Sequence, residues 1–121
     1  MMEESNVNWR LFVIYFFIIF LILFSNITFG QITATHFNAE WNKTNGVSWF
    51  MDLQECKSKG LVDIAKEPGK ATKHKIAVIP TVIIFKDGEE VLRFQADLSF
   101  KMVATKEEVQ EEIDNLLMSD F

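Results

Sequence analysis

The first pattern along the chain is an uninterrupted apolar run from Leu11 to Phe24. It has no polar face, which argues against a buried core helix of the domain. Its 14 residues would cover about 21 Å as a helix, less than the ~30 Å of a hydrocarbon core. This length is typical of the apolar region of a signal peptide, so residues 1–30 are expected to be a leader.

Small residues at the end of the segment Ser25–Gly30 fit a cleavage site, with Gln31 as the new N-terminus. The alternative is an uncleaved membrane anchor, because Glu3 and Glu4 leave the preceding region without a clear positive charge. Arg10 precedes the apolar run, which favours a domain outside the cytoplasm in either case. We therefore expect an exported protein, either periplasmic or secreted, or else anchored by this helix.

After residue 30 the pattern changes to short β-prone runs separated by polar segments. Strands are predicted at Gln31–Phe37, Leu61–Ala65, Thr81–Phe85 and Glu90–Phe94. The third of these is apolar throughout, as in a central strand. The sequence Lys86–Glu89 contains Asp-Gly and predicts a tight hairpin turn.

Three helices are predicted between and after these strands. Val47–Lys57 has apolar residues at helical spacing, Pro68–Lys75 opens with proline in its first turn, and Thr105–Met118 starts with a capping box. Asn45 or Thr44 would cap the first helix and Gly60 would end it. The resulting order is β-α-β-α-β-β-α, an α/β fold with parallel strands in its first half.

Composition narrows the class of protein. The 121 residues allow one small domain, here residues 31–121, and a hydrophobic content of 49% excludes a disordered chain. Without residues 1–30 the formal charge changes from −5 to −4, which argues against a nucleic-acid partner. One cysteine excludes an internal disulfide. The two histidines have no ligand cluster around them, so neither a metal nor a cofactor is expected.

Three local strings, taken with the element order, resemble the thioredoxin family. They are Phe37-Asn38-Ala39-Glu40-Trp41 after the first strand, Ile79-Pro80-Thr81 before the third, and Phe85-Lys86-Asp87-Gly88-Glu89 at the hairpin. The resemblance implies a three-layer α/β/α sandwich on a mixed four-stranded sheet, in a minimal form. It also implies a cis proline at Pro80 and a peptide-binding groove formed by Trp41, Asn42, Asn45, Ile79, Pro80 and Thr81.

The chain departs from the family at the centre of its chemistry. Family enzymes follow the tryptophan with Cys-x-x-Cys, whereas both cysteine positions here hold asparagine, Asn42 and Asn45. Thiol–disulfide exchange needs a thiolate and a resolving thiol, and an amide supplies neither. By the same resemblance, the buried acid and its lysine partner of the family would align with His36 and Leu61. One of the asparagines is expected to cap the following helix.

The remaining thiol, Cys56, is predicted near the end of that helix, far from the position that lowers a thiol pKa. It is expected to be unreactive, with an intermolecular disulfide as the alternative. His36 is expected to be hydrogen-bonded and structural. The segment Asp97–Ala104 alternates apolar and polar residues, so it predicts either an added edge strand or an exposed apolar ridge for a partner.

The sequence therefore predicts a redox-inactive binding or scaffolding module for a protein or an extended peptide. It would contact a membrane only if the N-terminal segment is uncleaved. An oxidoreductase-related protein that uses Cys56, or a partner reductase, is the alternative. A structural subunit of an envelope complex is a third possibility.

Overall fold

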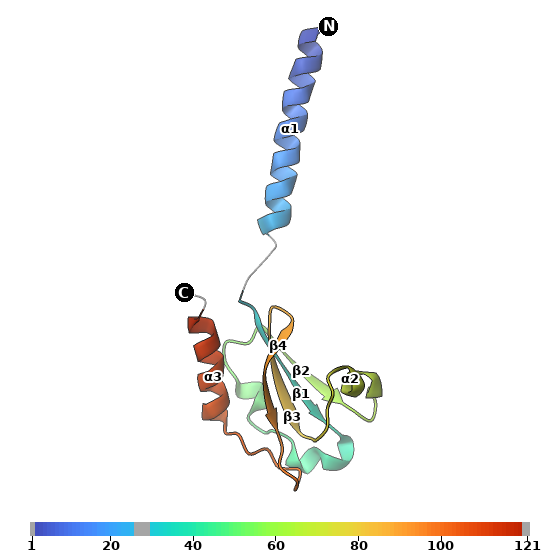
Figure 1. The fold of residues 1–121 in the computed structure, drawn as a ribbon, viewed down its shortest axis with the longest axis vertical. Coiled ribbons are helices and arrows are strands. Elements are labelled where there is room, and N and C mark those ends of the chain that lie inside the picture. The colour runs from blue at the N-terminus through green and yellow to red at the C-terminus, as the bar shows by residue number, and fades with distance from the viewer. Residues whose placement is uncertain (1, 26–29, 120–121) are drawn as a thin grey trace.

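The computed structural model describes residues 2–25 and 30–119, and within the first helix it describes the side chains of residues 9–21 only. The helix α1 (Met2–Ser25) contains the apolar run, and its described side chains are exposed (Figure 1). Judged on the described residues, no helix is both long and apolar enough to cross a membrane. Most of the predicted cleavage region Ser25–Gly30 lies outside the described residues, so cleavage stays a prediction.

The rest of the chain is built on a mixed four-stranded sheet with the order β2-β1-β3-β4. Its strands are β1 (Ile32–Asn38), β2 (Ser58–Asp63), β3 (Thr81–Lys86) and β4 (Glu89–Gln95). β1 pairs with β2 in parallel and with β3 antiparallel, and β3 pairs with β4 antiparallel. The parallel first half and antiparallel second half are as the sequence predicts.

The turn between β3 and β4 is the predicted two-residue hairpin. Asp87 and Gly88 both have positive φ, 53° and 85°, as a type I′ turn requires. The Asp87 carboxylate also accepts hydrogen bonds from the backbone N–H groups of Gly30 (3.1 Å) and Gln31 (3.0 Å). The turn thereby anchors the chain where it enters β1.

Alternation along the buried strands gives the sheet two apolar faces. One face carries Val82 and Ile84 and is covered by α3 (Lys106–Met118) and by a loop with Phe50 and Leu53. The other carries Phe37, Val62 and Ile83 and lies on the side of α2 (Pro68–Lys73). Three layers result, the α/β/α sandwich that was expected.

The predicted helix Val47–Lys57 is wrong. The chain here forms two short 3₁₀ helices, η1 (Glu40–Asn45) and η2 (Phe50–Asp52), followed by an extended segment with a positive φ of 66° at Glu55. Its carbonyl groups find tertiary partners instead of helical ones. The Lys59 ammonium donates hydrogen bonds to the carbonyls of both Met51 and Leu53.

The Gln110 side chain provides two more tertiary hydrogen bonds in place of helical ones. The Gln54 N–H donates to Gln110 Oε1 (2.8 Å), and Gln110 Nε2 donates back to the Gln54 carbonyl (3.1 Å). With the loop tied to α3 in this way, Gly60 does not end a helix but lies within β2. Local apolar spacing predicted a helix, and contacts with distant residues override it.

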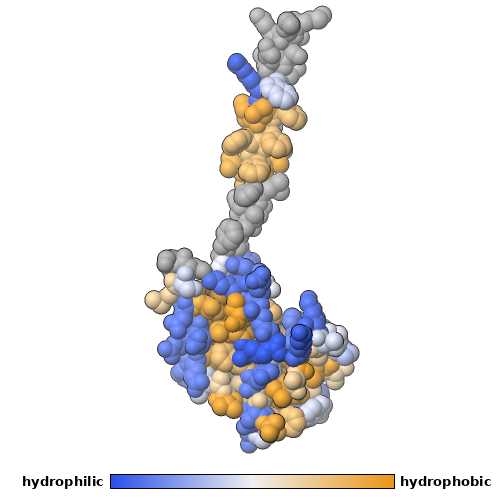
Figure 2. Space-filling view, viewed as in Figure 1, coloured by the Kyte–Doolittle hydropathy of each residue, from blue (hydrophilic) through white to orange (hydrophobic). Residues whose placement is uncertain are grey.

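The last helix begins where its capping residue predicts. The Thr105 hydroxyl accepts a hydrogen bond from the Glu108 N–H at 3.2 Å, and Val109 and Ile113 are fully buried against the sheet. The acidic residues of α3 form its hydrophilic outer face (Figure 2).

Candidate functional site

An apolar hollow opens at the end of the sheet where β1 and β2 finish and β3 begins. It has a volume of about 180 Å³ and is lined by Trp41, Ile64, Ile76, Ala77, Val78, Ile79 and Phe100. Figure 2 shows apolar side chains gathered at this lower end of the domain, where η1 and the loop between β4 and α3 lie in Figure 1. We call the hollow with these seven lining residues the terminal groove.

Two aromatic side chains from distant parts of the chain form one wall of the terminal groove. The rings of Trp41 and Phe100 meet edge to face with their centroids 5.5 Å apart. Trp41 is 67% exposed and Phe100 is 43% exposed. The two surfaces that the sequence suggested separately, one around Trp41 and one in the segment Asp97–Ala104, are therefore a single surface.

The opposite wall is the segment that leads into β3. The peptide bond between Ile79 and Pro80 is cis, as the resemblance implied, and both residues are buried. The Pro80 carbonyl accepts a hydrogen bond from the Ala96 N–H at 3.0 Å. Within the described residues nothing bonds to the backbone N–H or carbonyl of Ile79, so both groups can pair with an added extended chain. Thr81 is buried, and its hydroxyl donates to the Val78 carbonyl at 2.6 Å.

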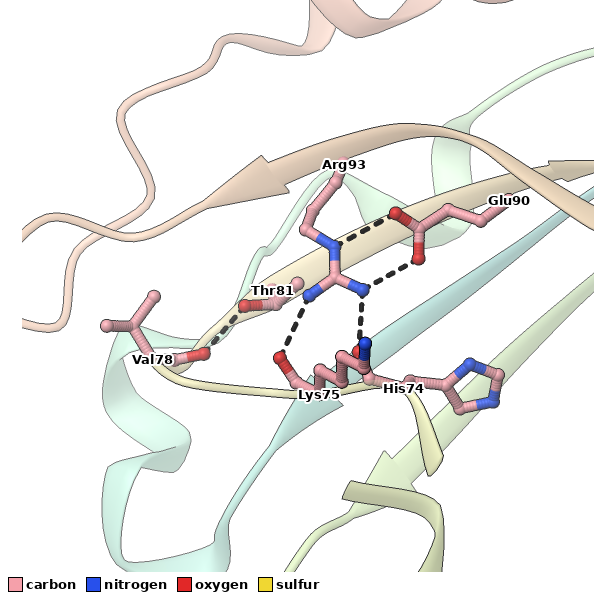
Figure 3. A network of polar contacts seen from close by, with 6 residues as sticks. All are labelled: His74, Lys75, Val78, Thr81, Glu90 and Arg93. Atoms are coloured by element: carbon pink, nitrogen blue, oxygen red, sulfur yellow. Dashed lines mark hydrogen bonds and ion pairs between the residues drawn. The ribbon is translucent and has the colours of Figure 1, made fainter. Parts of the chain in front are cut away.

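Arg93 on β4 fastens this wall to the sheet (Figure 3). Its guanidinium donates to the carbonyls of His74 (2.6 Å) and Lys75 (3.1 Å), the residues that follow α2. Two further bonds, of 3.1 and 2.7 Å, join it to the Glu90 carboxylate. These bonds hold the pKa of Glu90 below its usual range. One side chain therefore fixes where the segment from Ile76 to Ile79 runs.

The predicted site residues Asn42 and Asn45 do not face the terminal groove. Asn42 is 3% exposed, and its amide nitrogen donates to Asn38 Oδ1 at 3.0 Å. Asn38 donates in turn to the Asn42 carbonyl (3.2 Å), and Asn45 donates to Asn42 Oδ1 (2.9 Å). The expected capping role is wrong, because neither η1 nor η2 has a side-chain cap. Instead, three amides form a buried chain that stiffens η1.

His36 is hydrogen-bonded and structural, as expected. Its Nε2 accepts the Val47 N–H at 3.1 Å, and its ring packs against Phe50 with centroids 5.4 Å apart. Burial lowers the pKa of His36 because it disfavours the charged imidazolium. An acceptor at Nε2 also requires the neutral ring. The histidine thus holds the start of the loop that replaces the predicted helix.

The predicted edge strand in Asp97–Ala104 is wrong, and a compact loop takes its place. Only one isolated antiparallel bridge forms in the described part of this segment, between Ala96 and Met102. The Asp97 carboxylate accepts from the Ser99 hydroxyl (2.6 Å) and from the Lys101 N–H (3.1 Å), which lowers its pKa. Phe100 has a positive φ of 65°, and this conformation turns its ring toward Trp41.

Cys56 lies far from the terminal groove. The neighbouring Lys57 N–H donates to the Ile32 carbonyl at the start of β1, whereas Thr81, next to Pro80, pairs with Phe37 near its end. At ~3.3 Å per residue these ends are roughly 17 Å apart. The Cys56 thiol is half-buried, and desolvation raises its pKa.

Sequence reasoning identified two of the groove's lining residues in its predicted site, Trp41 and Ile79. It missed Ile76, which precedes Ile79 in the same segment, and also Ile64 and the part played by Phe100, which come from two other loops. Loop convergence of this kind leaves no local pattern, although the apolar residues in the predicted second strand and before Pro80 were visible. Within the described residues, no cluster of histidine, cysteine or acidic side chains could hold a metal ion.

Comparison with known proteins supports the resemblance. No protein-family model matches the chain. A segment of 42 residues is 45% identical to chloroplast thioredoxin Y1 of Arabidopsis thaliana, and this match covers 35% of the chain but only about a quarter (24%) of the relative's length.

Solved thioredoxin structures share the fold. A single-substitution mutant of thioredoxin from Halobacterium salinarum superposes with a TM-score of 0.56 at 15% identity, over 73% of this chain and 76% of that one. Thioredoxin from Fasciola hepatica gives 0.50 at 22% identity, over 71% and 81%. The chain therefore has a thioredoxin-like fold on a mixed four-stranded sheet, and its sequence has no Cys-x-x-Cys pair.

Proposed function

We propose that this thioredoxin-like domain binds an extended peptide or a segment of a partner protein in the terminal groove, without redox chemistry. The observation that carries the proposal is the exposed Trp41–Phe100 pair standing over an apolar hollow. Aromatic side chains left in water at a concave apolar surface favour a binding site. A hollow of about 180 Å³ suits one apolar side chain rather than a cofactor.

The backbone beside the hollow supports an extended ligand. The N–H and carbonyl of Ile79 can pair with a strand that runs past Pro80, while the hollow accepts one of its side chains. Arg93 keeps this wall in place before the ligand arrives, which reduces the entropy lost on binding.

The groups at the family's cysteine positions, together with the place of Cys56, support the absence of redox chemistry. Asn42 and Asn45 have no ionisable sulfur, and their amides already bond to one another and to Asn38. Cys56 is at the other end of β1 and has a raised pKa. These observations favour binding over the alternative in which Cys56, or a partner reductase, supports disulfide exchange.

We also propose that the domain works outside the cytoplasm, as a periplasmic or secreted protein or as one anchored by α1. The apolar run from Leu11 to Phe24 supports this proposal.

Substitution within one loop tests the binding site. Phe100→Asn removes the aromatic wall, and asparagine tolerates the positive φ of this position. Leu98→Asn is the matched control, since Leu98 is 94% exposed in the same loop and does not line the groove. An array of extended peptides, each with a central apolar residue, identifies a ligand for titration by fluorescence or calorimetry.

We expect Phe100→Asn to weaken binding of that peptide by ~tenfold or more, and Leu98→Asn to change it by less than ~twofold. Equal affinity for both variants, or no peptide bound by the unmodified chain, would contradict the proposed function.

A further inference from the structure

One margin of the sheet leaves a strand edge open. β2 is the first strand in the order β2-β1-β3-β4, and in the described part of the chain it has β1 as its sole neighbour. Ser58 and Gly60 are exposed, and Leu61 is 65% exposed although it lies in a strand. Open edges with apolar side chains are sites where another strand can add.

The hydrogen bonds to β1 determine which backbone groups of β2 face outward. The Ile64 N–H donates to the Asn38 carbonyl in the register of the β1–β2 pair, and this inward direction recurs at every second residue of a strand. Ser58, Gly60 and Val62 therefore bond to β1. Lys59 and Leu61 direct their N–H and carbonyl groups away from the sheet.

We propose that β2 pairs antiparallel with β2 of a second copy of this chain, with Leu61 opposite Leu61 on a two-fold axis. In this register the outward-directed N–H and carbonyl groups of Leu61 meet those of Leu61 in the other copy and form hydrogen bonds. Lys59 of each copy comes opposite Asp63 of the other. The strand is thus complementary to itself in its outward-directed backbone groups, in apolar contact and in charge.

The side chains involved lie on the same face of the sheet. Lys59, Leu61 and Asp63 pair with Ala34, His36 and Asn38 of β1, and side chains alternate between faces along a strand. The Lys59 ammonium donates to two backbone carbonyls, which leaves its third N–H for a carboxylate. Leu61 contributes most to the stability of the dimer, because pairing removes its exposed surface from water.

A second copy fits this edge better than an unrelated strand. Opposite charges at Lys59 and Asp63, placed symmetrically about Leu61, are satisfied by the strand's own sequence in reverse. On the other face α2 brings Lys70 and Lys73 near the edge. Lys70 is already paired with Glu67 at 3.0 Å, which limits repulsion between the two copies.

Cross-linking of the full chain in detergent micelles tests the register. Leu61→Cys and Ser58→Cys are made separately in a Cys56→Ser background, so that each protein has one thiol. Residues opposite each other on the axis can form a disulfide, whereas the two copies of residue 58 would be roughly 20 Å apart. With mild oxidation we expect at least ~fivefold more covalent dimer from Leu61→Cys. Equal yields from both variants, or no dimer from Leu61→Cys, would overturn the proposal.

Exchanging the charges of Lys59 and Asp63 tests whether the partner is a second copy of the chain. Restored association in a mixture of the variants also shows that both are folded. Lys59→Glu alone and Asp63→Lys alone each place like charges opposite one another. Sedimentation should show dimerisation weakened by ~tenfold or more in each variant. Mixing the two variants should restore a one-to-one dimer. Failure of the mixture to associate, while both variants keep the circular dichroism of the unmodified chain, would contradict the pairing. Neither result depends on whether the terminal groove binds peptides.

Discussion

At the scale of single residues, the two asparagines have a structural role that their positions did not reveal. They occupy the places of the family's cysteines, and the sequence predicted that they cap a helix. The structure instead buries Asn42 in a chain of amide hydrogen bonds with Asn38 and Asn45. Sequence could show that asparagines replace the cysteine pair, but the hydrogen-bond partners depend on how η1 turns.

Asn42→Ala tests this role. The substitution leaves the buried Asn38 Oδ1 without its donor, which should lower the free energy of unfolding by about 1–3 kcal/mol. Lys43→Ala is the control, because the Lys43 side chain is 72% exposed and its ion pair with Glu40 lies at the surface. Denaturation in urea measures both. Equal stability of the two variants would show that the amide chain does not stabilise the fold.

Cys56 should behave as an inert thiol. Its pKa is raised by burial, so the thiolate is scarce at neutral pH. The rate of alkylation by iodoacetamide, followed from pH 6 to 11, should rise with a midpoint above the ~8.5 of an ordinary cysteine. A midpoint clearly below that value would instead favour a reactive thiol and the alternative function.

At the scale of elements, the strands, the hairpin and α3 could be predicted because local signals agree with tertiary structure there. Residues 82–85 of the internal strand β3 are apolar throughout, and Asp87-Gly88 has the φ angles its turn needs. The segment after Asn45 could not be predicted. Lys59 on β2 and Gln110 on α3 satisfy its backbone groups and remove the need for a helix.

His36 should make the attachment of this loop dependent on pH. Because folding lowers the pKa of His36, the unfolded chain binds a proton more readily, and stability is complete above the unfolded value of ~6.5. Stability should fall as the pH drops from about 6.5 toward the lower, folded pKa. Urea denaturation between pH 7.5 and 5 measures the change.

The control for this titration is His36→Gln, which keeps an acceptor for the Val47 N–H but cannot titrate. Its stability should vary less over the same range. The carboxylates Glu90 and Asp97, whose pKa values are lowered, lose their stabilising hydrogen bonds only in more acidic solution, below about pH 4. An equal pH dependence in the variant and the unmodified chain would show that His36 is not the group responsible.

Arg93 links β4 to the segment that follows α2. We expect the planar shape of its guanidinium to matter more for this link than its charge. Arg93→Lys keeps the charge but loses the fork that reaches two carbonyls and Glu90 (Figure 3). Thermal denaturation should show a loss of about 1–3 kcal/mol, and peptide affinity should fall with it. Glu89→Ala, at an exposed position of the same strand, should change neither. A fully stable Arg93→Lys variant would contradict the role assigned to this clamp.

At the scale of the whole molecule, one sheet carries two proposed surfaces on different elements. The terminal groove lies where loops converge at the end of β1, and the proposed dimer uses the open edge of β2. From sequence, the fold class and the absence of a Cys-x-x-Cys pair could be deduced, together with Trp41 and Ile79. The rest of the groove needs Ile64, Ile76 and Phe100, which only the folded chain brings together.

Export of this domain is tested by the mass of its N-terminal peptide. If residues 1–30 are a leader, protein recovered from outside the cytoplasm should begin at Gln31. An intact N-terminus on membrane-bound protein would instead support the anchor, and an intact N-terminus on protein from the cytoplasm would contradict export.

The central claim, that this thioredoxin-like domain binds partners and does not exchange disulfides with them, is tested most directly by the reduction of insulin. Turbidity from the released chains is followed with dithiothreitol, with and without the protein, and with a Cys56→Ser variant beside it. Both proteins should leave the rate at that of buffer alone. Turnover above buffer that disappears in the Cys56→Ser variant would contradict the central claim.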